Sequence, residues 1–455
     1  MYYAKLVQNL GIAYYLYPRR SSLHVNHAAL STMVTFRPTA VLFPHARSLD
    51  WSSLQLEDES LPVMLAMLGP RMKRIVVDEW GFSLDEPRHS FQLPLAIIAS
   101  NFPLLEDFDL SLPTSNEDDH LLWPALQLIS QKLTRLKSFA CNNIYVNEQT
   151  FWNLGKLSGL TSLDIRLPAH LMWSSSNKPR ATFPALRDLA FTTFAHDYIR
   201  FSTIATFPTA KTLHLTILGP PGPLEIPALF ASICAQTSAT SLVEVNIFPV
   251  VDDMAPNRDV VQQSGSVLQP AHMQPLLSLK RLQILTVDLA CRYALTTEFY
   301  MELAKALPEA ASIWLGEGEL CVHDLPYPDI RCLPSFARHC PKLSSIAVHV
   351  DGSTQPISTD DVQSALPSDA PPSHVDHLRV GASRIGDPQG VAAYLACIFP
   401  DLDASCLTHS WNEVAGTAEA HTYRRKWDQV QASLPWFKVL QSVERERVTS
   451  VGRAE

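Results

Sequence analysis

Charged residues and glycine are both scarce in this chain of 455 residues. Only 18% of the residues are charged and only 16 are Gly, whereas 46% are hydrophobic. A disordered chain has the opposite balance, so the composition indicates a folded protein. Few glycines leave little material for phosphate-cradling loops, and the sequence has neither a P-loop nor an HExxH motif. Because acidic residues outnumber basic ones by 45 to 36, giving a net charge of −9, we expect no nucleic-acid partner.

Disulfide patterns, glycosylation signals and long apolar runs are missing as well. The 8 cysteines lack a dense regular spacing and no Asn-x-Ser/Thr sequence occurs, which together favour an intracellular location, cytoplasmic or nuclear. No stretch approaches the roughly 20 consecutive apolar residues that cross a bilayer, so we expect a soluble protein without a membrane partner. The first residues differ from a signal peptide because Arg19 and Arg20 follow the short apolar run. We interpret that segment as a helical fragment.

The sequence does contain a recurring phrase, in which an apolar residue is followed by apolar residues three and five positions later. The phrase occurs thirteen times, and its first residues are 24 to 40 positions apart. Such a period is typical of leucine-rich repeats with irregular lengths. The thirteen triplets are Ala46/Leu49/Trp51, Met72/Ile75/Val77, Leu105/Phe108/Leu110, Leu136/Phe139/Cys141, Leu160/Leu163/Ile165, Leu186/Leu189/Phe191, Ala210/Leu213/Leu215, Leu242/Val245/Ile247, Leu282/Leu285/Val287, Ala310/Ile313/Leu315, Leu343/Ile346/Val348, Val375/Leu378/Val380 and, weakest, Leu402/Ser405/Leu407.

The last two apolar residues of each phrase predict a short strand with one buried and one exposed face. Residues two apart on a strand point to the same side, and the residue between them points away. Parallel strands need return segments, and helices with Asn147 and Thr296 as caps fit that role. We therefore predict an α/β fold, a leucine-rich-repeat solenoid with a curved parallel β-sheet and helices on its outer face. Its expected parts are an N-terminal helical cap or remnant (1–40), the solenoid (41–410) and a C-terminal helical cap (411–455).

Several repeat openings resemble a known family. The segments PTAVLFPHARSLDW, NFPLLEDFDLSLP, TFPALRDLAF and HCPKLSSIAV are similar to those of leucine-rich-repeat F-box proteins, and RPTAVLFPHARSLDW resembles those of basidiomycete fungi in particular. The similarity spans Pro38 to Leu407. It implies substrate recognition for a cullin-type ubiquitin ligase, with an N-terminal F-box bound to a Skp-type adaptor. No residues before Leu49 match an F-box. Three alternatives remain: the F-box is lost, it lies upstream, or the chain is a repeat-only relative. We expect the Skp-type adaptor as a partner only if an F-box lies upstream.

Two groups of residues suggest other chemistry. Five potential zinc ligands, Cys321, His323, Cys332, His339 and Cys340, fall within twenty residues. Their spacing does not form two pairs of ligands, so we expect small apolar cysteines and no metal. Ser383 in GASRIG approaches a nucleophile elbow but has one residue too many. An α/β hydrolase is thus a remote alternative, and we expect no catalytic residue, no cofactor and no enzyme.

The exposed strand face is the predicted binding surface, because there the variable residues line up from repeat to repeat. Several aspartates in the early repeats suggest a basic protein partner, and Trp314 is the kind of aromatic that anchors interfaces. The alternative interpretation is an ordinary solvated strand face, and the alternative function is a ligase-independent scaffold or regulator. The candidate binding residues are Asp50, Asp78, Asp107, Asp109, Asp164, Arg166, His214, Asn246, Trp314, His349 and Arg379.

Overall fold

The computed structural model describes most of the chain as two compact units. Unit 1 comprises Met1–Thr193 and Arg200–Ala210, and unit 2 comprises Phe194–Ile199 and Lys211–Glu455. The described residues are 8–12, 41–52, 60–78, 91–112, 119–169, 180–250, 265–316, 322–323, 327–353, 355–358, 360–361, 373–410 and 418–451.

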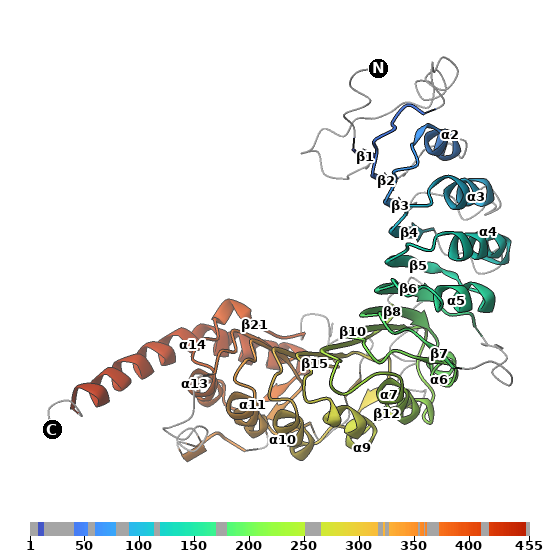
Figure 1. The fold of residues 1–455 in the computed structure, drawn as a ribbon. Coiled ribbons are helices and arrows are strands. Elements are labelled where there is room, and N and C mark those ends of the chain that lie inside the picture. The colour runs from blue at the N-terminus through green and yellow to red at the C-terminus, as the bar shows by residue number, and fades with distance from the viewer. Residues whose placement is uncertain are drawn as a thin grey trace. The chain divides into compact units, whose positions relative to one another are not determined.

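The strands of unit 1 form a parallel sheet in the order of the chain (Figure 1). These strands are β1 (Asn9–Ile12), β2 (Ser48–Ser52), β3 (Arg74–Asp78), β4 (Asp107–Ser111), β5 (Ser138–Tyr145), β6 (Ser162–Arg166) and β8 (Asp188–Thr193). Helices follow several of them, namely α2 (Ser60–Met67), α3 (Gln92–Asn101), α4 (Asp119–Lys132) and α5 (Glu148–Leu154). After β8 come α6 (Ala195–Phe201), most of which belongs to unit 2, and β9 (Ala205–Thr206), which pairs with β7 (Ala181–Thr182).

Unit 2 repeats this plan. Its main parallel sheet holds β10 (Thr212–Ile217), β11 (Glu244–Pro249), β13 (Ile284–Val287), β15 (Ser312–Leu315), β17 (Ser345–Ala347), β19 (His377–Arg379) and β21 (Leu407–Thr408). Its helices are α7 (Glu225–Gln236), α9 (Pro270–Met273), α10 (Thr297–Ala306), α11 (Leu333–His339), α13 (Pro388–Ile398) and α14 (Ala418–Val451), with 3-10 turns η3 (Gln274–Ser278), η4 (Ile330–Cys332) and η5 (Ala404–Cys406). Small parallel sheets join β12 (Val267–Leu268), β14 (Arg292–Tyr293) and β16 (Val322–His323), and β18 (Asp351–Gly352) with β20 (Arg384–Ile385).

The core lies between the main sheet of each unit and its helices. In twelve of the thirteen repeat phrases all three apolar residues are buried, so the predicted buried face is confirmed. The exception is the weakest phrase, in which Leu402 and Leu407 are buried but Ser405 is exposed in η5. Helical turns return the chain from strand to strand on the same side of each sheet (Figure 1). The fold is therefore an α/β solenoid of the leucine-rich-repeat type.

Helix caps support the local pattern. The Asn147 side chain accepts a hydrogen bond from the backbone N–H of Thr150 at 2.8 Å, which begins α5. Thr296 accepts in the same way from the N–H of Phe299 and begins α10. Both caps confirm the predicted return helices, since each satisfies an N–H that has no partner within the helix.

The N-terminal segment differs from its prediction. Residues 9–12 were expected within a helical fragment, but they form β1, which pairs with β2 so that Gly11 lies opposite Asp50. A short strand satisfies the backbone groups along the edge of β2, which a helix at this place leaves open. The remainder of the expected cap, at residues 1–7 and 13–40, lies outside the described residues.

The described part of the C-terminal segment is one helix, α14. Trp427, Val430 and Leu434 on this helix are buried against the end of unit 2. The indole Nε1 of Trp427 donates to the backbone oxygen of Ser383 at 2.9 Å. The contact with Ser383 and the burial of these side chains anchor the first half of α14 to the last repeats.

Candidate functional site

Three aspartates lie in one row across the sheet of unit 1. Strand register places Asp50 opposite Val76, Val76 opposite Asp109, Asp109 opposite Ala140, and Ala140 opposite Asp164. Each aspartate is flanked along its strand by two buried residues, so its side chain points to the face away from the core. We call Asp50, Asp109 and Asp164 the carboxylate row. A carboxylate thus occupies every second strand, with a small or apolar side chain between.

Asp78 and Asp107 extend the acidic surface on either side of the row. Asp78 pairs with Ser111 at the carboxyl end of β4, and Asp107 pairs with Arg74 at the start of β3. Both aspartates are only partly exposed. The five aspartates predicted from the sequence therefore share one face of unit 1.

Burial and mutual repulsion perturb two members of the carboxylate row. Burial raises the pKa of Asp164 to about 6, and the negative charge of Asp109 adds to the rise. The pKa of Asp109 is also raised, first by burial, then by Asp78, with a smaller contribution from Asp50. Arg74 opposes that rise but does not cancel it. Carboxylates that are partly desolvated and crowded with like charge are favourable partners for cations.

Arg166 was predicted to be exposed on this face, and that prediction is wrong. The residue is only 7% exposed, and its guanidinium lies over the ring of Tyr145 with 4.4 Å between Cζ and the ring centroid. The cause is an irregularity in β5 between Cys141 and Tyr145, which places Tyr145 opposite Arg166. A cation–π contact stabilises the partly desolvated charge.

The corresponding row of unit 2 is polar and aromatic. Register places His214 opposite Asn246, and Thr286 opposite both Asn246 and Trp314. Asn246 was expected to be exposed but is 5% exposed, because its Nδ2 donates to Glu244 Oε1 at 2.6 Å and lies 3.2 Å from His214 Nδ1. These contacts fix the side chains of β10 and β11 in a polar network.

Trp314 and Arg379 lie close together on this face. The indole Nε1 of Trp314 donates to Ser345 Oγ at 3.0 Å, and the guanidinium Cζ of Arg379 lies 5.1 Å from the Trp314 ring centroid. The sequence prediction missed Phe248, which is 39% exposed two residues after Asn246 on β11. Residues two apart on a strand point to the same side. This alternation predicts that Phe248, like Asn246, points away from the core.

His349 has a packing role. The prediction that it is exposed is wrong, because it is 5% exposed and its ring lies edge-on to Tyr327 with the centroids 6.3 Å apart. Gly381 has φ +51°, and a Cβ added there would lie 2.1 Å from His349 Nε2. The imidazole thus fills the space that a side chain at position 381 would need.

Two of the five potential zinc ligands, Cys332 and Cys340, are buried. Burial raises the pKa of Cys340 to about 12, and its thiol lies 3.3 Å from the backbone oxygen of Ala304. Cys332 is fully buried, and burial raises its thiol pKa strongly. Both thiols therefore stay protonated in the folded chain. Cys321 lies outside the described residues.

Ser383 is also a structural residue. It is fully buried, its Oγ accepts from the backbone N–H of Val350 at 2.8 Å, and it donates to the backbone oxygen of Val380. A hydroxyl so enclosed has no approach for a substrate, so Ser383 does not support the hydrolase alternative.

No cluster of three or more His, Cys, Asp or Glu side chains suited to a metal ion occurs within the described ranges. Among the helices that the structure describes, none combines the length and apolar character needed to span a bilayer.

Comparison with known proteins gives distant similarities. No protein-family model matches the sequence. No curated protein matches it either. Three solved structures are similar: the complex of Rad7 and Elc1 in yeast (15% identity, 73% of this chain and 74% of that chain, TM-score 0.36), the leucine-rich repeat-containing protein LegL7 from Legionella pneumophila (11%, 92% and 97%, 0.29) and a protein from Bacteroides fragilis (14%, 56% and 66%, 0.24). These similarities are too low to bear on function, so the description of the chain as a leucine-rich-repeat solenoid rests on its own strand order and buried repeat phrase.

Proposed function

We propose that the strand face of the repeats binds other proteins, and that unit 1 binds a basic segment along the carboxylate row. The observation that carries this proposal is the register that aligns Asp50, Asp109 and Asp164 across the sheet. The raised pKa of Asp109 and of Asp164 supports it, because a bound cation relieves the repulsion and partial desolvation of these carboxylates.

The spacing of the row indicates the form of the partner. Neighbouring strands lie about 4.8 Å apart, so carboxylates on every second strand are separated by about 9.6 Å. A polyproline II helix rises about 3.1 Å per residue with three residues per turn, which repeats a side chain every ~9.3 Å. A segment with Lys or Arg at every third residue therefore places one cation on each carboxylate. The peptide residues that separate these cations contact Val76 and Ala140.

The face of unit 2 adds a second type of contact. Trp314, stacked near Arg379, and the partly exposed Phe248 are residue types that are enriched at protein interfaces. The flanking network of His214, Asn246 and Glu244 supplies oriented polar groups. This face fits a partner with apolar and hydrogen-bonding groups, in contrast to the cationic partner of unit 1.

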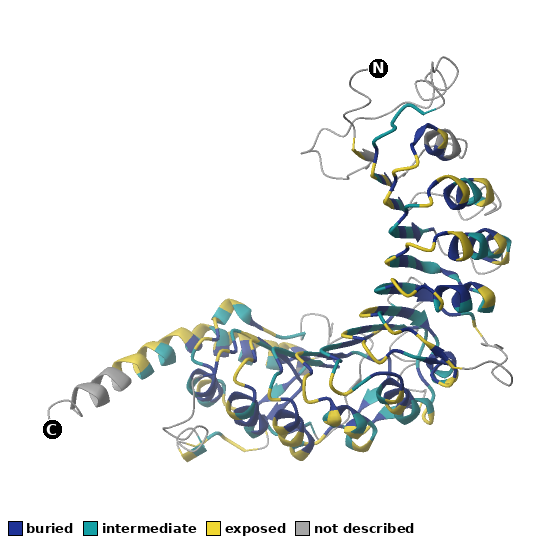
Figure 2. Ribbon diagram, viewed as in Figure 1, coloured by how far each residue is buried: buried dark blue, intermediate teal, exposed yellow. Residues whose placement is uncertain are grey.

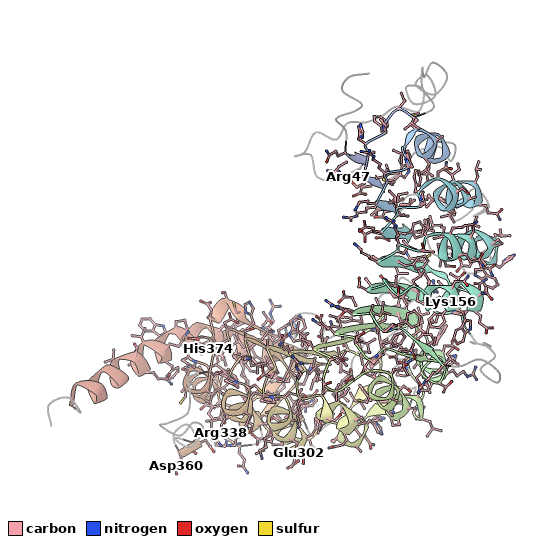
Figure 3. All side chains as sticks on the ribbon, viewed as in Figure 1. Arg47, Lys156, Glu302, Arg338, Asp360 and His374 are labelled. Atoms are coloured by element: carbon pink, nitrogen blue, oxygen red, sulfur yellow. The ribbon has the colours of Figure 1, made fainter. Side chains whose placement is uncertain are left out.

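A synthetic peptide tests the proposal on unit 1. We expect a fluorescent (Lys-Ala-Pro)4 peptide to bind the full chain, with affinity that falls as salt rises. Asp109→Asn should weaken binding about 3- to 10-fold, because one partly desolvated charge pair is lost. The control is Glu302→Gln, which removes one negative charge on the helix side of unit 2 (Figure 3) and should leave binding unchanged.

Fluorescence anisotropy measures the affinity for the peptide. If Asp109→Asn and Glu302→Gln change this affinity equally, a role for the carboxylate row is refuted. A peptide of the same composition with its four lysines contiguous should bind more weakly. Equal binding of the two peptides would refute the third-residue spacing.

We further propose that this binding serves substrate recognition in a cullin-type ubiquitin ligase. The support is the resemblance of the repeat openings, such as RPTAVLFPHARSLDW, to those of fungal leucine-rich-repeat F-box proteins. Retention of a Skp-type adaptor by the product of a full-length transcript tests this role. Failure to retain it favours the alternative, a ligase-independent scaffold or regulator, as does an upstream reading frame without a hydrophobic Leu-Pro segment.

A further inference from the structure

A line of mostly basic residues lies at the edge of unit 1 where its strands begin. Each of these residues comes directly before a strand, and the line follows the order of the strands in the sheet, from β2 to β8. From the second residue onwards, each backbone N–H donates to the backbone oxygen of the preceding member at 2.7 or 2.8 Å. The members of this line are Arg47, Lys73, Glu106, Lys137, Thr161 and Arg187.

Three of the cations are spaced at every second strand. Lys73 precedes β3, Lys137 precedes β5 and Arg187 precedes β8. We call these three residues the cation row. Neighbouring strands lie about 4.8 Å apart, so neighbours in the cation row are separated by about 9.6 Å. The carboxylate row lies on the alternate strands β2, β4 and β6, so the two rows use different strands of the same sheet.

The cations are open to solvent. The side chains of Lys73 and Lys137 are 51% and 58% exposed, and Arg187 is exposed as well. Within the described ranges, no carboxylate pairs with the guanidinium of Arg187. Arg47 adds a fourth exposed cation and lies beside the strands in Figure 3. Figure 2 shows exposed residues in the segments that lead into these strands, whereas the strands are mainly buried or intermediate.

Glu106 sits between two members of the cation row. Its Oε1 accepts a hydrogen bond from Lys73 Nζ at 2.6 Å, and its Oε2 accepts one from Lys137 Nζ at 2.5 Å. The hydrogen bonds from Lys137 and Lys73 lower the pKa of Glu106 to about 2, so it is ionised at neutral pH. One carboxylate cannot neutralise two ammonium groups, and Arg47 and Arg187 add two further cations. This edge therefore carries a positive charge in a chain whose net charge is −9.

We propose that the cation row binds an acidic segment of a partner protein, with Asp or Glu at every third residue. Such a segment in a polyproline II helix repeats a side chain every ~9.3 Å, close to the separation within the row. Carboxylates at this period meet Lys73, Lys137 and Arg187 in turn. The residues between them pass Glu106 and Thr161 without placing a negative charge there. This site goes beyond the proposed binding of a basic segment, because it uses other residues of opposite charge.

The surroundings of the row favour a protein segment over a nucleic acid. A nucleic-acid strand carries a negative charge about every 3.4 Å, so its phosphates also lie opposite the residues between the cations. Glu106 is one of those residues, and Asp107 and Asp188 begin the adjoining strands β4 and β8. An acidic peptide with two uncharged residues between its carboxylates avoids these repulsive contacts.

A synthetic acidic peptide tests the proposal. We expect a fluorescent (Glu-Ala-Pro)4 peptide to bind the full chain in fluorescence anisotropy, with affinity that falls as salt rises. Arg187→Gln should weaken this binding about 2- to 5-fold, the effect of one exposed ion pair. The control is Lys156→Gln, which removes one exposed positive charge on the helix side of unit 1 (Figure 3) and should leave the affinity unchanged. If the two variants bind the peptide equally well, the proposal is overturned.

Glu106→Gln gives a change of the opposite sign. It removes the carboxylate that holds Lys73 and Lys137 and leaves both ammonium groups for the peptide. The affinity for (Glu-Ala-Pro)4 should therefore rise about 2- to 5-fold. A merely structural role of Glu106 predicts no such rise, so an affinity that stays the same or falls contradicts binding at the cation row.

The order of the peptide and a competing polyanion test the form of the partner. A peptide of the same composition with its four glutamates contiguous should bind more weakly, and equal binding of the two peptides would overturn the third-residue spacing. A single-stranded oligonucleotide of the same length should also bind more weakly than (Glu-Ala-Pro)4 at the same salt concentration. Equal or tighter binding of the oligonucleotide would overturn the choice of a protein segment.

The two proposals for unit 1 can fail independently. Asp109→Asn should weaken the binding of the basic peptide but not that of the acidic peptide, and Arg187→Gln should do the reverse. If (Lys-Ala-Pro)4 binds the full chain and (Glu-Ala-Pro)4 does not, the cation row is refuted and the carboxylate row stands.

Discussion

At the scale of single residues, adjacent positions on one strand have opposite roles. Leu163 is fully buried, whereas Asp164 beside it belongs to the carboxylate row. This alternation follows from the period of two along a strand, so the sequence alone predicts which of the two residues faces the core. What the sequence does not predict is the depth of burial of Asp164, because that depends on side chains from neighbouring strands.

Alanine substitutions at these two positions should differ sharply. Leu163→Ala should lower the free energy of unfolding by about 2–5 kcal/mol, since it leaves a cavity in the core. Asp164→Ala should leave stability nearly unchanged and weaken the binding of the basic peptide. Urea denaturation and fluorescence anisotropy measure the two effects, and equal stability losses would contradict the assignment of the two faces.

The pKa of Asp164 predicts a pH dependence of stability. Because burial raises this pKa to about 6, above its unfolded value near 3.8, the folded state takes up a proton first as the pH falls. The contribution of Asp164 to stability should therefore increase as pH falls from 7.5 towards 4. The free energy of unfolding of the original chain relative to Asp164→Asn should rise by about 1 kcal/mol between pH 7.5 and 5. A constant difference in urea denaturation over this range would contradict the raised pKa.

Gly381 is a position where a side chain should not be tolerated. Its φ is +51°, and an added Cβ meets the ring of the buried His349. Gly381→Ala should cost about 3 kcal/mol of stability, from left-handed backbone strain and overpacking. The control is Gly265→Ala, where φ is +68° but no atom lies within 4 Å, so only the backbone cost of about 1–2 kcal/mol applies. Thermal unfolding compares the two, and equal costs would exclude a steric role for His349.

At the scale of elements, the repeat phrase predicts where the strands lie better than it predicts the register in which neighbouring strands pair. The parallel order of the strands and the caps at Asn147 and Thr296 follow from local sequence. The irregularity in β5 that buries Arg166 under Tyr145 does not, because strand register is set by pairing between distant segments. The same limit applies to β1, whose partner β2 lies more than thirty residues away.

We propose that α14 acts as the C-terminal cap of the solenoid, and substitutions on its two faces test this. Trp427 is fully buried and donates a hydrogen bond to Ser383 O, so Trp427→Ala should cost about 3–5 kcal/mol. Trp436→Ala on the exposed face should change stability by no more than about 0.5 kcal/mol. Chemical denaturation compares the two. Similar values for both would contradict a cap that packs through the Trp427 face.

At the scale of the whole molecule, each unit combines a uniform core with a distinctive strand face. The core residues of both units follow the same phrase, whereas the face is acidic in unit 1 and aromatic and polar in unit 2. The sequence predicts the acidic character of the early repeats, but only the register shows that three aspartates share one row. In a repeat fold the buried residues thus provide the stability, and the outward residues can vary with the partner.

Cross-linking of a bound basic peptide is the most direct test of the strand face as the binding surface. A carbodiimide joins a lysine to a carboxylate only where the two are in contact. With (Lys-Ala-Pro)4 bound to the full chain, mass spectrometry should place the cross-links on Asp50, Asp109 and Asp164. Cross-links confined to carboxylates on the helix side, such as Glu298 and Glu302, would contradict binding at the strand face.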